Sequence, residues 1–249
     1  AYFYRRPFIA YTPMPAPFRV ILAAVVLGAL VPVRGWAQAS PYVPLDDPRL
    51  PLLEHLISRG DIEDPSPMVR PFRRADAARV LAAADSAGAA PLVHALRGQF
   101  EDPPNQNSWR VGIRAGGQAY SHIRRDVLHP LGPDGVRPYV DLTGEAAFGP
   151  FAVVSRPAAE PRVVDDPEWP GRTDLKLAWR MVEAYASAQF KYGSVFYGQM
   201  DRNWGPAGVA GIGLSNYGYS QVESGFDLGT RTLRLYALAR QLRDDQDTL

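Results

Sequence analysis

Apolar and polar residues alternate with a period of two along most of the chain beyond residue 108. Between residues 109 and 120, Trp109, Val111 and Ile113 alternate with small or polar residues, two of which are arginines, so one face of this segment is apolar. The same alternation recurs over residues 139–148, 182–190 and 233–240, with less regular segments at 151–156, 195–204 and 217–226. The pattern predicts about seven β-strands.

The connections between these segments alternate between long and short. Long connections are expected at residues 121–138, 157–172 and 205–216, and short ones at Gly149-Pro150, Tyr192-Gly193 and 227–230. A soluble β-sandwich also has alternating strands, but a regular exchange of long loops and short turns is typical of outer-membrane barrels. The aromatic residues Trp109, Phe148, Phe151, Phe190 and Tyr192 would gather at the short-turn ends, where an interfacial girdle belongs. The sequence therefore predicts a mainly β fold, a transmembrane antiparallel β-barrel preceded by a small α-helical segment.

Seven strands do not complete such a barrel, because bacterial barrels have an even number of strands and leave no edge unpaired in lipid. The polar end of the chain, residues 244–249, has the composition of another external loop. We expect residues 108–249 to be an incomplete barrel, the first part of a longer, truncated one.

Residues 40–107 have helical rather than strand periodicity. Four apolar residues between Leu52 and Ile57 share one face, and Gly60 follows as a C-cap. Further helices are expected at residues 74–84 and 92–100, with a linker at 101–107. The apolar stripes are too narrow to support an independent enzyme, so this segment should dock on another part of the protein, on the periplasmic side.

An apolar run at residues 20–33 is bracketed by Arg19 and Arg34 and followed by Ala37-Gln38-Ala39. It is shorter than the ~20 residues that a membrane-spanning helix needs, and its small-x-small ending is typical of a signal peptide. The alternative is a buried core helix. We expect residues 1–39 to be an upstream extension plus a signal peptide, with Met14 as the true start and Ser40 as the first residue after cleavage.

Composition narrows the classes of function. The formal net charge is +1 and the 249 residues include no cysteine, which argues against nucleic acid as a partner and excludes disulfides and thiol catalysis. The four histidines lack metal-binding spacing, and neither a G-x-S-x-G pattern nor a dinucleotide-binding pattern occurs. We therefore expect a protein that is not an enzyme and needs no cofactor or metal.

Three stretches resemble the capsule-assembly Wzi family of outer-membrane proteins. Residues 41–60, with the run LLEHLISRG, and residues 70–81, RPFRRADAARVL, are similar to the helices that open such proteins. The most specific stretch is GQMDRNWGP at residues 198–206, followed by GLSN at 213–216. The resemblance implies a large barrel with periplasmic helices at or near its mouth, and a lectin role in holding capsular polysaccharide.

Polysaccharide binding uses aromatic rings against sugar C–H surfaces, flanked by groups that bond to hydroxyls. The candidates that supply this set near the external ends of two neighbouring strands are Asp201, Arg202, Asn203, Trp204, Tyr217 and Tyr219. The alternative is that Asp201 and Arg202 only pair locally while residues 204–206 shape the loop, and that Tyr217 and Tyr219 belong to an external aromatic girdle.

The polar faces of the strands are expected to form the wall of the lumen. The wall candidates, of mixed charge, are Arg110, Arg114, Asp141, Glu145, Glu183, Gln199, Arg234 and Arg240. Such residues typically form a hydrogen-bonded wall or hold a plug, and a conducting pore is the alternative.

Arg180 departs from the alternation, because it falls on the lipid-facing parity of its strand. A bulge near Met181, or a strand that projects beyond the membrane, would reconcile the two halves of this strand. We expect Arg180 to lie above the hydrocarbon layer.

The function expected from these features and from the resemblance is surface attachment or assembly of capsular or other exopolysaccharide by an outer-membrane barrel. A general or sugar-selective porin is the alternative. The expected partners are surface polysaccharide and outer-membrane lipid, with the helical segment in the periplasm.

Overall fold

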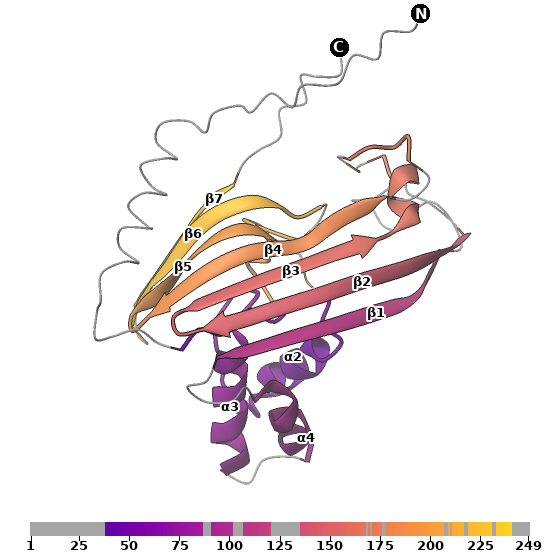
Figure 1. Cartoon of the computed structure of the whole chain (residues 1–249). Helices are drawn as coiled ribbons and strands as arrows, with labels where there is room; N and C mark the ends of the chain where they lie inside the picture. Colours follow the sequence, from indigo (N-terminus) through magenta and orange to yellow (C-terminus); the bar gives the residue numbers. More distant parts are fainter. Residues whose placement is uncertain are drawn as a thin grey trace, which may run out of the picture. The chain divides into compact units, whose positions relative to one another are not determined.

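The computed structural model describes residues 38–86, 91–101, 107–120, 135–167, 169, 171–175, 178–206, 209, 211–216, 219–230 and 233–240. The signal peptide expected within residues 1–39 lies outside this part except for Gln38 and Ala39, and the chain end at 244–249 also lies outside it. Within the described ranges the fold is mainly β, with a few short helices (Figure 1). None of these helices is long and apolar enough to cross a membrane.

The helices expected in the first part of the chain are confirmed in type and position. They are α2 (Leu50–Arg59), α3 (Arg74–Ser86) and α4 (Pro91–Phe100), and a 3-10 helix, η1 (Pro161–Asp165), lies in a later connection. Helix α2 ends at Gly60, whose φ of 76° is left-handed, and the amide of Gly60 donates to the carbonyl oxygen of Ile57. Leu53, Leu81 and Phe100 belong to one buried apolar cluster that joins the three α-helices.

All the expected strands are present in the described part of the chain. They are β1 (Ser108–Tyr120), β2 (Gly135–Phe148), β3 (Phe151–Ala159), β4 (Trp179–Phe190), β5 (Gly193–Met200), β6 (Gln221–Gly229) and β7 (Arg234–Arg240). They form one antiparallel sheet in chain order, and among the described residues β1 and β7 each pair on one side only, so the sheet is not closed.

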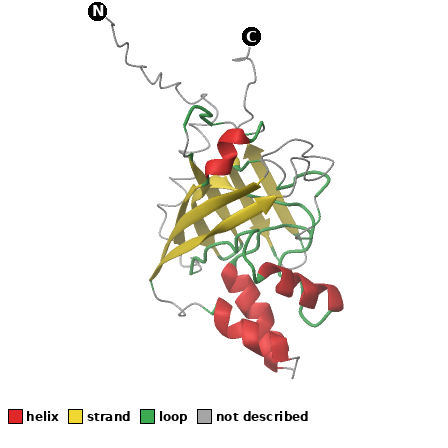
Figure 2. Ribbon diagram, turned by 90° about the vertical axis from the view of Figure 1, so that its right-hand side faces the viewer, coloured by secondary structure: helices red, strands yellow, loops and turns green. Residues whose placement is uncertain are grey.

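The expected alternation of long and short connections is confirmed. Short turns join β2 to β3, β4 to β5 and β6 to β7, whereas long connections join β1 to β2, β3 to β4 and β5 to β6. The three α-helices and η1 lie at opposite ends of the strands (Figure 2). Because η1 belongs to a long connection, the long connections leave the sheet at the end away from the α-helices.

Two expected strands are shorter than their sequence patterns. The strand expected over residues 195–204 ends at Met200, because Asn203 leaves the sheet and exchanges two backbone hydrogen bonds with Arg70, of 2.8 and 3.0 Å. The strand expected from Tyr217 begins only at Gln221.

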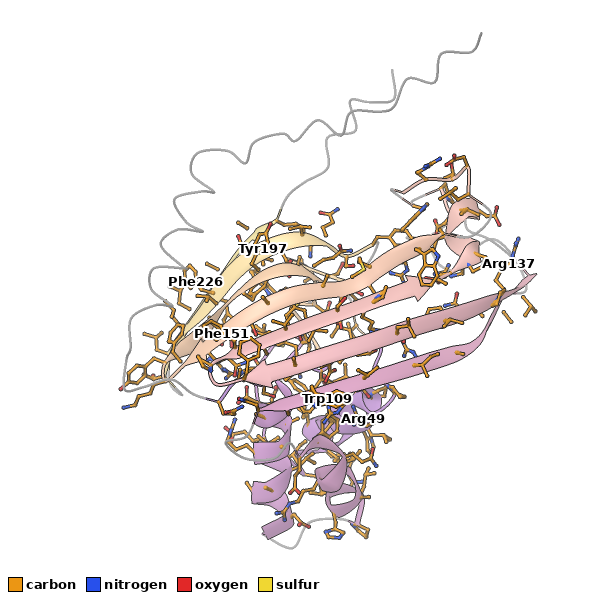
Figure 3. The ribbon with its side chains drawn as sticks, in the orientation of Figure 1. Arg49, Trp109, Arg137, Phe151, Tyr197 and Phe226 are labelled. Carbon is orange, nitrogen blue, oxygen red and sulfur yellow. The ribbon has the colours of Figure 1, made fainter. Side chains whose placement is uncertain are left out.

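The two faces of the sheet differ in what covers them. We call one the packed face, because residues 38–49 and 62–76, here termed the covering segment, lie against its side chains. The other is the open face, which carries Trp109, Phe151 and Tyr197 (Figure 3). Large apolar side chains are exposed along this open face, including Val111, Ile113, Leu142, Val153, Val222 and Leu235.

The irregularity expected in the fourth strand is a β-bulge. Opposite β3, Arg156 pairs with Glu183 but Pro157 pairs with Met181, so β4 contains one extra residue between these pairs. The bulge expected near Met181 is therefore confirmed. It turns the Arg180 side chain toward the buried Glu160, to which its Nε donates a hydrogen bond of 2.6 Å.

Candidate functional site

The covering segment begins beside the short-turn end of the sheet. The amide of Ala39 donates to the carbonyl oxygen of Gly149 over 2.8 Å, in the turn between β2 and β3. The next residue, Ser40, exchanges hydrogen bonds with the buried side-chain amide of Gln189, which donates to the Ser40 carbonyl oxygen over 2.7 Å. Further along, the amide of Tyr42 donates to the hydroxyl of Tyr185 over 2.9 Å. The segment is thus tied by hydrogen bonds to β4 and to the turn between β2 and β3.

A network of charges joins the covering segment to the middle of the sheet. Arg156 donates to Asp46 over 2.7 Å and to Asp141 over 2.9 Å, and Arg114 donates to the same Asp141 oxygen over 2.7 Å. Burial alone would raise the pKa of the Asp46 carboxyl, but the hydrogen bonds and charges of Arg156 and Arg114 outweigh it and lower this pKa to about 2. Asp46 is therefore an anion at neutral pH.

A second charged contact fixes the start of α3. Arg74 donates to both oxygens of Glu145 on β2, over 3.0 and 2.9 Å; the Arg74 side chain is buried and that of Glu145 is nearly so. Arg110 of β1 lies 3.4 Å from the same carboxylate. Five of the wall candidates, Arg110, Arg114, Asp141, Glu145 and Glu183, are thus on the packed face, where they meet the covering segment or its partners.

The remaining wall candidates divide between the two faces. Arg234 pairs with Asp227, and Arg240 lies 3.3 Å from the buried Glu223, both on the packed face. The placement expected for Gln199 is wrong. Its neighbours across the strands are Ala184 and Val222, and alternate residues of β5 such as Phe196 and Met200 are the buried ones. Gln199 is therefore on the open face, where its amide donates to the backbone oxygens of Met181 and Ser220.

Two of the polysaccharide candidates are interior residues. The Arg202 guanidinium lies 3.7 Å from the centre of the Phe196 ring and pairs with Glu223. Asn203 is only 1% exposed, and its side-chain amide donates to the carbonyl oxygens of Pro206 and Val209 over 2.8 and 2.9 Å. The structure thus places Arg202 and Asn203 in the interior rather than on the surface, where they make the local contacts of the alternative.

The other candidates do not form one cluster. Trp204 is 37% exposed. Asp201 is half-buried, and burial raises the pKa of its carboxyl to about 6, although the charge of Arg180 opposes this effect. Tyr219 instead donates to the Asp166 carboxylate over 2.9 Å and contacts the Trp169 ring edge-on at 4.9 Å. Burial, followed by the charge of Asp166, raises the pKa of the Tyr219 hydroxyl. Tyr217 lies outside the described residues.

The partners of Tyr219 carried no signal in the sequence. Asp166 and Trp169 belong to the long connection between β3 and β4, which has no periodic pattern. The same connection holds Glu160, which is fully buried between Arg162 and Arg180 at 2.6 Å from each. Arg180 outweighs the effect of burial and, with Arg162, lowers the pKa of this carboxyl. This group of charges ties the connection to β4.

A groove lies on the packed face between the covering segment and the strands β6 and β7. Trp204 and Tyr236 line it together with two ion pairs, Arg73 with Asp76 and Arg234 with Asp227. Its lining thus combines the aromatic and charged groups that sugar recognition requires. Of the sequence candidates it includes Arg202, Trp204 and Arg234.

Compared with protein-family models, with curated proteins and with solved structures, the chain gives no match. Within the described ranges, no three or more His, Asp and Glu side chains are arranged to hold a metal ion.

Proposed function

We propose that this chain forms part of an outer-membrane β-barrel that attaches or assembles capsular or other exopolysaccharide at the cell surface, without catalysing a reaction. The resemblance of three stretches to the Wzi family favours the same role.

The observation that carries the proposal is the inverted polarity of the sheet. Asp141, Arg156 and Glu223 are buried on the packed face, whereas Trp109, Val111 and Ile113 on the open face are 80%, 73% and 72% exposed. A water-soluble sheet buries its apolar side and solvates its polar one. Lipid hydrocarbon around the open face would account for the reversal, and a contiguous apolar surface of this kind otherwise marks an interaction site.

The length of the strands fits this interpretation. The part of β2 from Val136 to Phe148 is ~40 Å long at ~3.3 Å per residue, and a tilt of ~40° would give it a height of ~30 Å. That height covers the apolar band of an outer-membrane barrel, which is ~25 Å tall. Trp109, Phe148 and Tyr192 are exposed close to the short-turn end, as expected of an interfacial girdle.

The covering segment favours a closed lumen over a porin. It occupies the face that would line a channel, and it is held there by ion pairs that include the buried Arg156 and Arg74. A freely conducting pore would leave this wall exposed to water. Steady open channels formed by the protein in planar bilayers would contradict the closed lumen and support the porin.

Lipid contact can be tested with variants that keep a single tryptophan, the others being replaced by phenylalanine. In liposomes of brominated phosphatidylcholine, the fluorescence of Trp109 and Trp179 should be strongly quenched, because both side chains are exposed on the open face, at the starts of β1 and β4. Trp169 and Trp204 are matched controls in the connections and should keep their emission. Equal quenching of all four, or none at Trp109, would reject the membrane assignment.

The polysaccharide role needs a cellular measurement. Cells that lack the protein should release surface polysaccharide into the medium, and restoring the protein should restore retention. If retention is unchanged although the protein reaches the outer membrane, the proposed role is wrong while the membrane assignment stands.

A further inference from the structure

The groove between the covering segment and β6 and β7 has features of a ligand site that a structural contact alone would not need. The side chains that matter are Arg73, Asp76, Trp204, Asp227, Arg234 and Tyr236. Trp204 comes from the long connection after β5, whereas Asp227 and Arg234 lie next to the short turn between β6 and β7. Residues from the covering segment, from the connection after β5 and from β6 and β7 thus meet in the groove.

Its aromatic rings are held but not covered. Tyr236 is half-buried, and its hydroxyl is 3.1 Å from the hydroxyl of Ser66 in the covering segment, which fixes the direction of the ring. Trp204 remains 37% exposed, although its backbone amide is fixed by the carbonyl oxygen of Leu214 over 2.7 Å. Partly exposed rings on a fixed backbone give a sugar face a surface to stack on.

The two ion pairs offer both kinds of hydrogen-bonding group. Arg73 lies 2.7 Å from Asp76, and the Arg234 Nε lies 3.3 Å from Asp227. Their side chains are 15% to 28% exposed, so each pair still reaches the groove. An arginine beside a carboxylate presents donors and an acceptor together, as neighbouring hydroxyls on a sugar require.

The charges of the groove also select among sugars. The two arginines and two aspartates sum to zero, and the nearby Arg202 is neutralised by Glu223. A chain of uronic acids would meet no excess of positive charge there, whereas a neutral sugar would leave both ion pairs intact.

We propose that this groove binds a neutral oligosaccharide, with Trp204 and Tyr236 stacking on its rings and the two ion pairs bonding its hydroxyls. The inference rests on the proposed role in polysaccharide attachment and gives it a site on the packed face, apart from the outer surfaces of the long connections.

Calorimetric titration of the detergent-solubilised protein tests the site, with maltohexaose, cellohexaose and mannohexaose as neutral probes and hexagalacturonic acid as the anionic one. We expect saturable binding of at least one neutral probe, weakened about tenfold by Trp204→Ala and by Tyr236→Ala. Trp109→Phe, on the open face, is the control and should leave binding unchanged. Tyr236→Phe keeps the ring and should retain most of the affinity, which separates stacking from a fault in folding.

Several outcomes would overturn the inference. These are no binding of any neutral probe, tighter binding of the uronic acid, or equal affinity in the Trp204→Ala protein. If lipid quenches Trp109 and cells retain polysaccharide but no neutral probe binds, only the groove assignment fails. If a neutral probe binds through Trp204 but Trp109 is not quenched, the membrane assignment fails and the groove remains.

Discussion

Arg156 of β3 donates a hydrogen bond to Asp46 of the covering segment over 2.7 Å, although the two residues are 110 positions apart in the chain. The arginine is buried and also bonds to Asp141. A buried guanidinium needs such partners, because an unpaired charge away from water is strongly destabilising. The covering segment therefore contributes one of the charges that hold this arginine, and removing it would leave Arg156 with Asp141 and the more distant Glu183.

Acid should weaken this contact. The folded pKa of Asp46, about 2, lies below its ordinary value of 3.8, so the stabilisation is fully present above pH 3.8 and is lost as the pH falls toward 2. We expect Asp46→Asn to lower the thermal midpoint at pH 7, and the gap to the parent protein to close between pH 4 and 2. Thermal unfolding of both proteins in detergent at several pH values measures this difference in thermal midpoint. A constant gap across this range would show that the carboxylate charge is not involved.

The contact of Arg74 with Glu145 should stabilise the fold more than that of Asp46, because the Arg74 side chain is buried and that of Glu145 is nearly so. Arg74→Met leaves the carboxylate of Glu145 with only the more exposed Arg110, and we expect a loss of ~3–5 kcal/mol in the free energy of unfolding. The double variant Arg74→Met with Glu145→Leu should recover most of it, since no buried charge remains. Arg79→Met is the control, because Arg79 is exposed and lies 3.7 Å from its partner Asp76. Unfolding of the four proteins in urea measures these differences, and a double variant no better than the single one would contradict the assignment.

The strands could be predicted because a period of two and the turn residues are local signals. The ends of the strands were harder to predict where a proline lies near them, because proline usually marks the end of a strand. Strand β3 continues past Pro157, because the bulge in the β3–β4 register falls beside this proline. Strand β2 begins at Gly135 and includes Pro138, because β3 ends opposite Val140 and leaves β2 without a neighbour on that side there.

The site was harder to predict because its contacts are not local. Nothing near Asp46 in the sequence indicates an arginine partner on β3, and nothing near Asn203 indicates the backbone pairing with Arg70. The sequence predicts the wrong face for Gln199, because a polar side chain usually marks the polar side of a strand. Its amide bonds to backbone oxygens, so this residue is satisfied on the open face.

The side chain of Asn203 should hold the connection after β5 in its conformation. The Gly211 amide donates to its Oδ1 over 2.8 Å, in addition to the bonds that its own amide donates. Asn203→Ala would leave these backbone groups without partners, at a cost of ~1–3 kcal/mol. Hydrogen exchange should then become faster at the Gly211 amide, while the exposed Asn216→Ala serves as a control with no effect. Unchanged protection at Gly211 would mean that other contacts hold the connection.

The environment of the open face can be decided by placing a charge on it at two depths. Ile113 lies near the middle of β1, opposite Leu142, whereas Val136 lies near the long-connection end of β2, and both are highly exposed. In a membrane, Ile113→Arg should cost ~2–4 kcal/mol at mid-bilayer and Val136→Arg only ~0–1 kcal/mol near the interface. In water, neither change buries a charge, so both variants should be as stable as the parent protein. Assembly into liposomes, followed by heat-dependent gel mobility and protease resistance, measures the difference. A selective loss of assembly in Ile113→Arg would indicate lipid around the open face, and equal behaviour of the two variants would indicate that this face meets water or another protein.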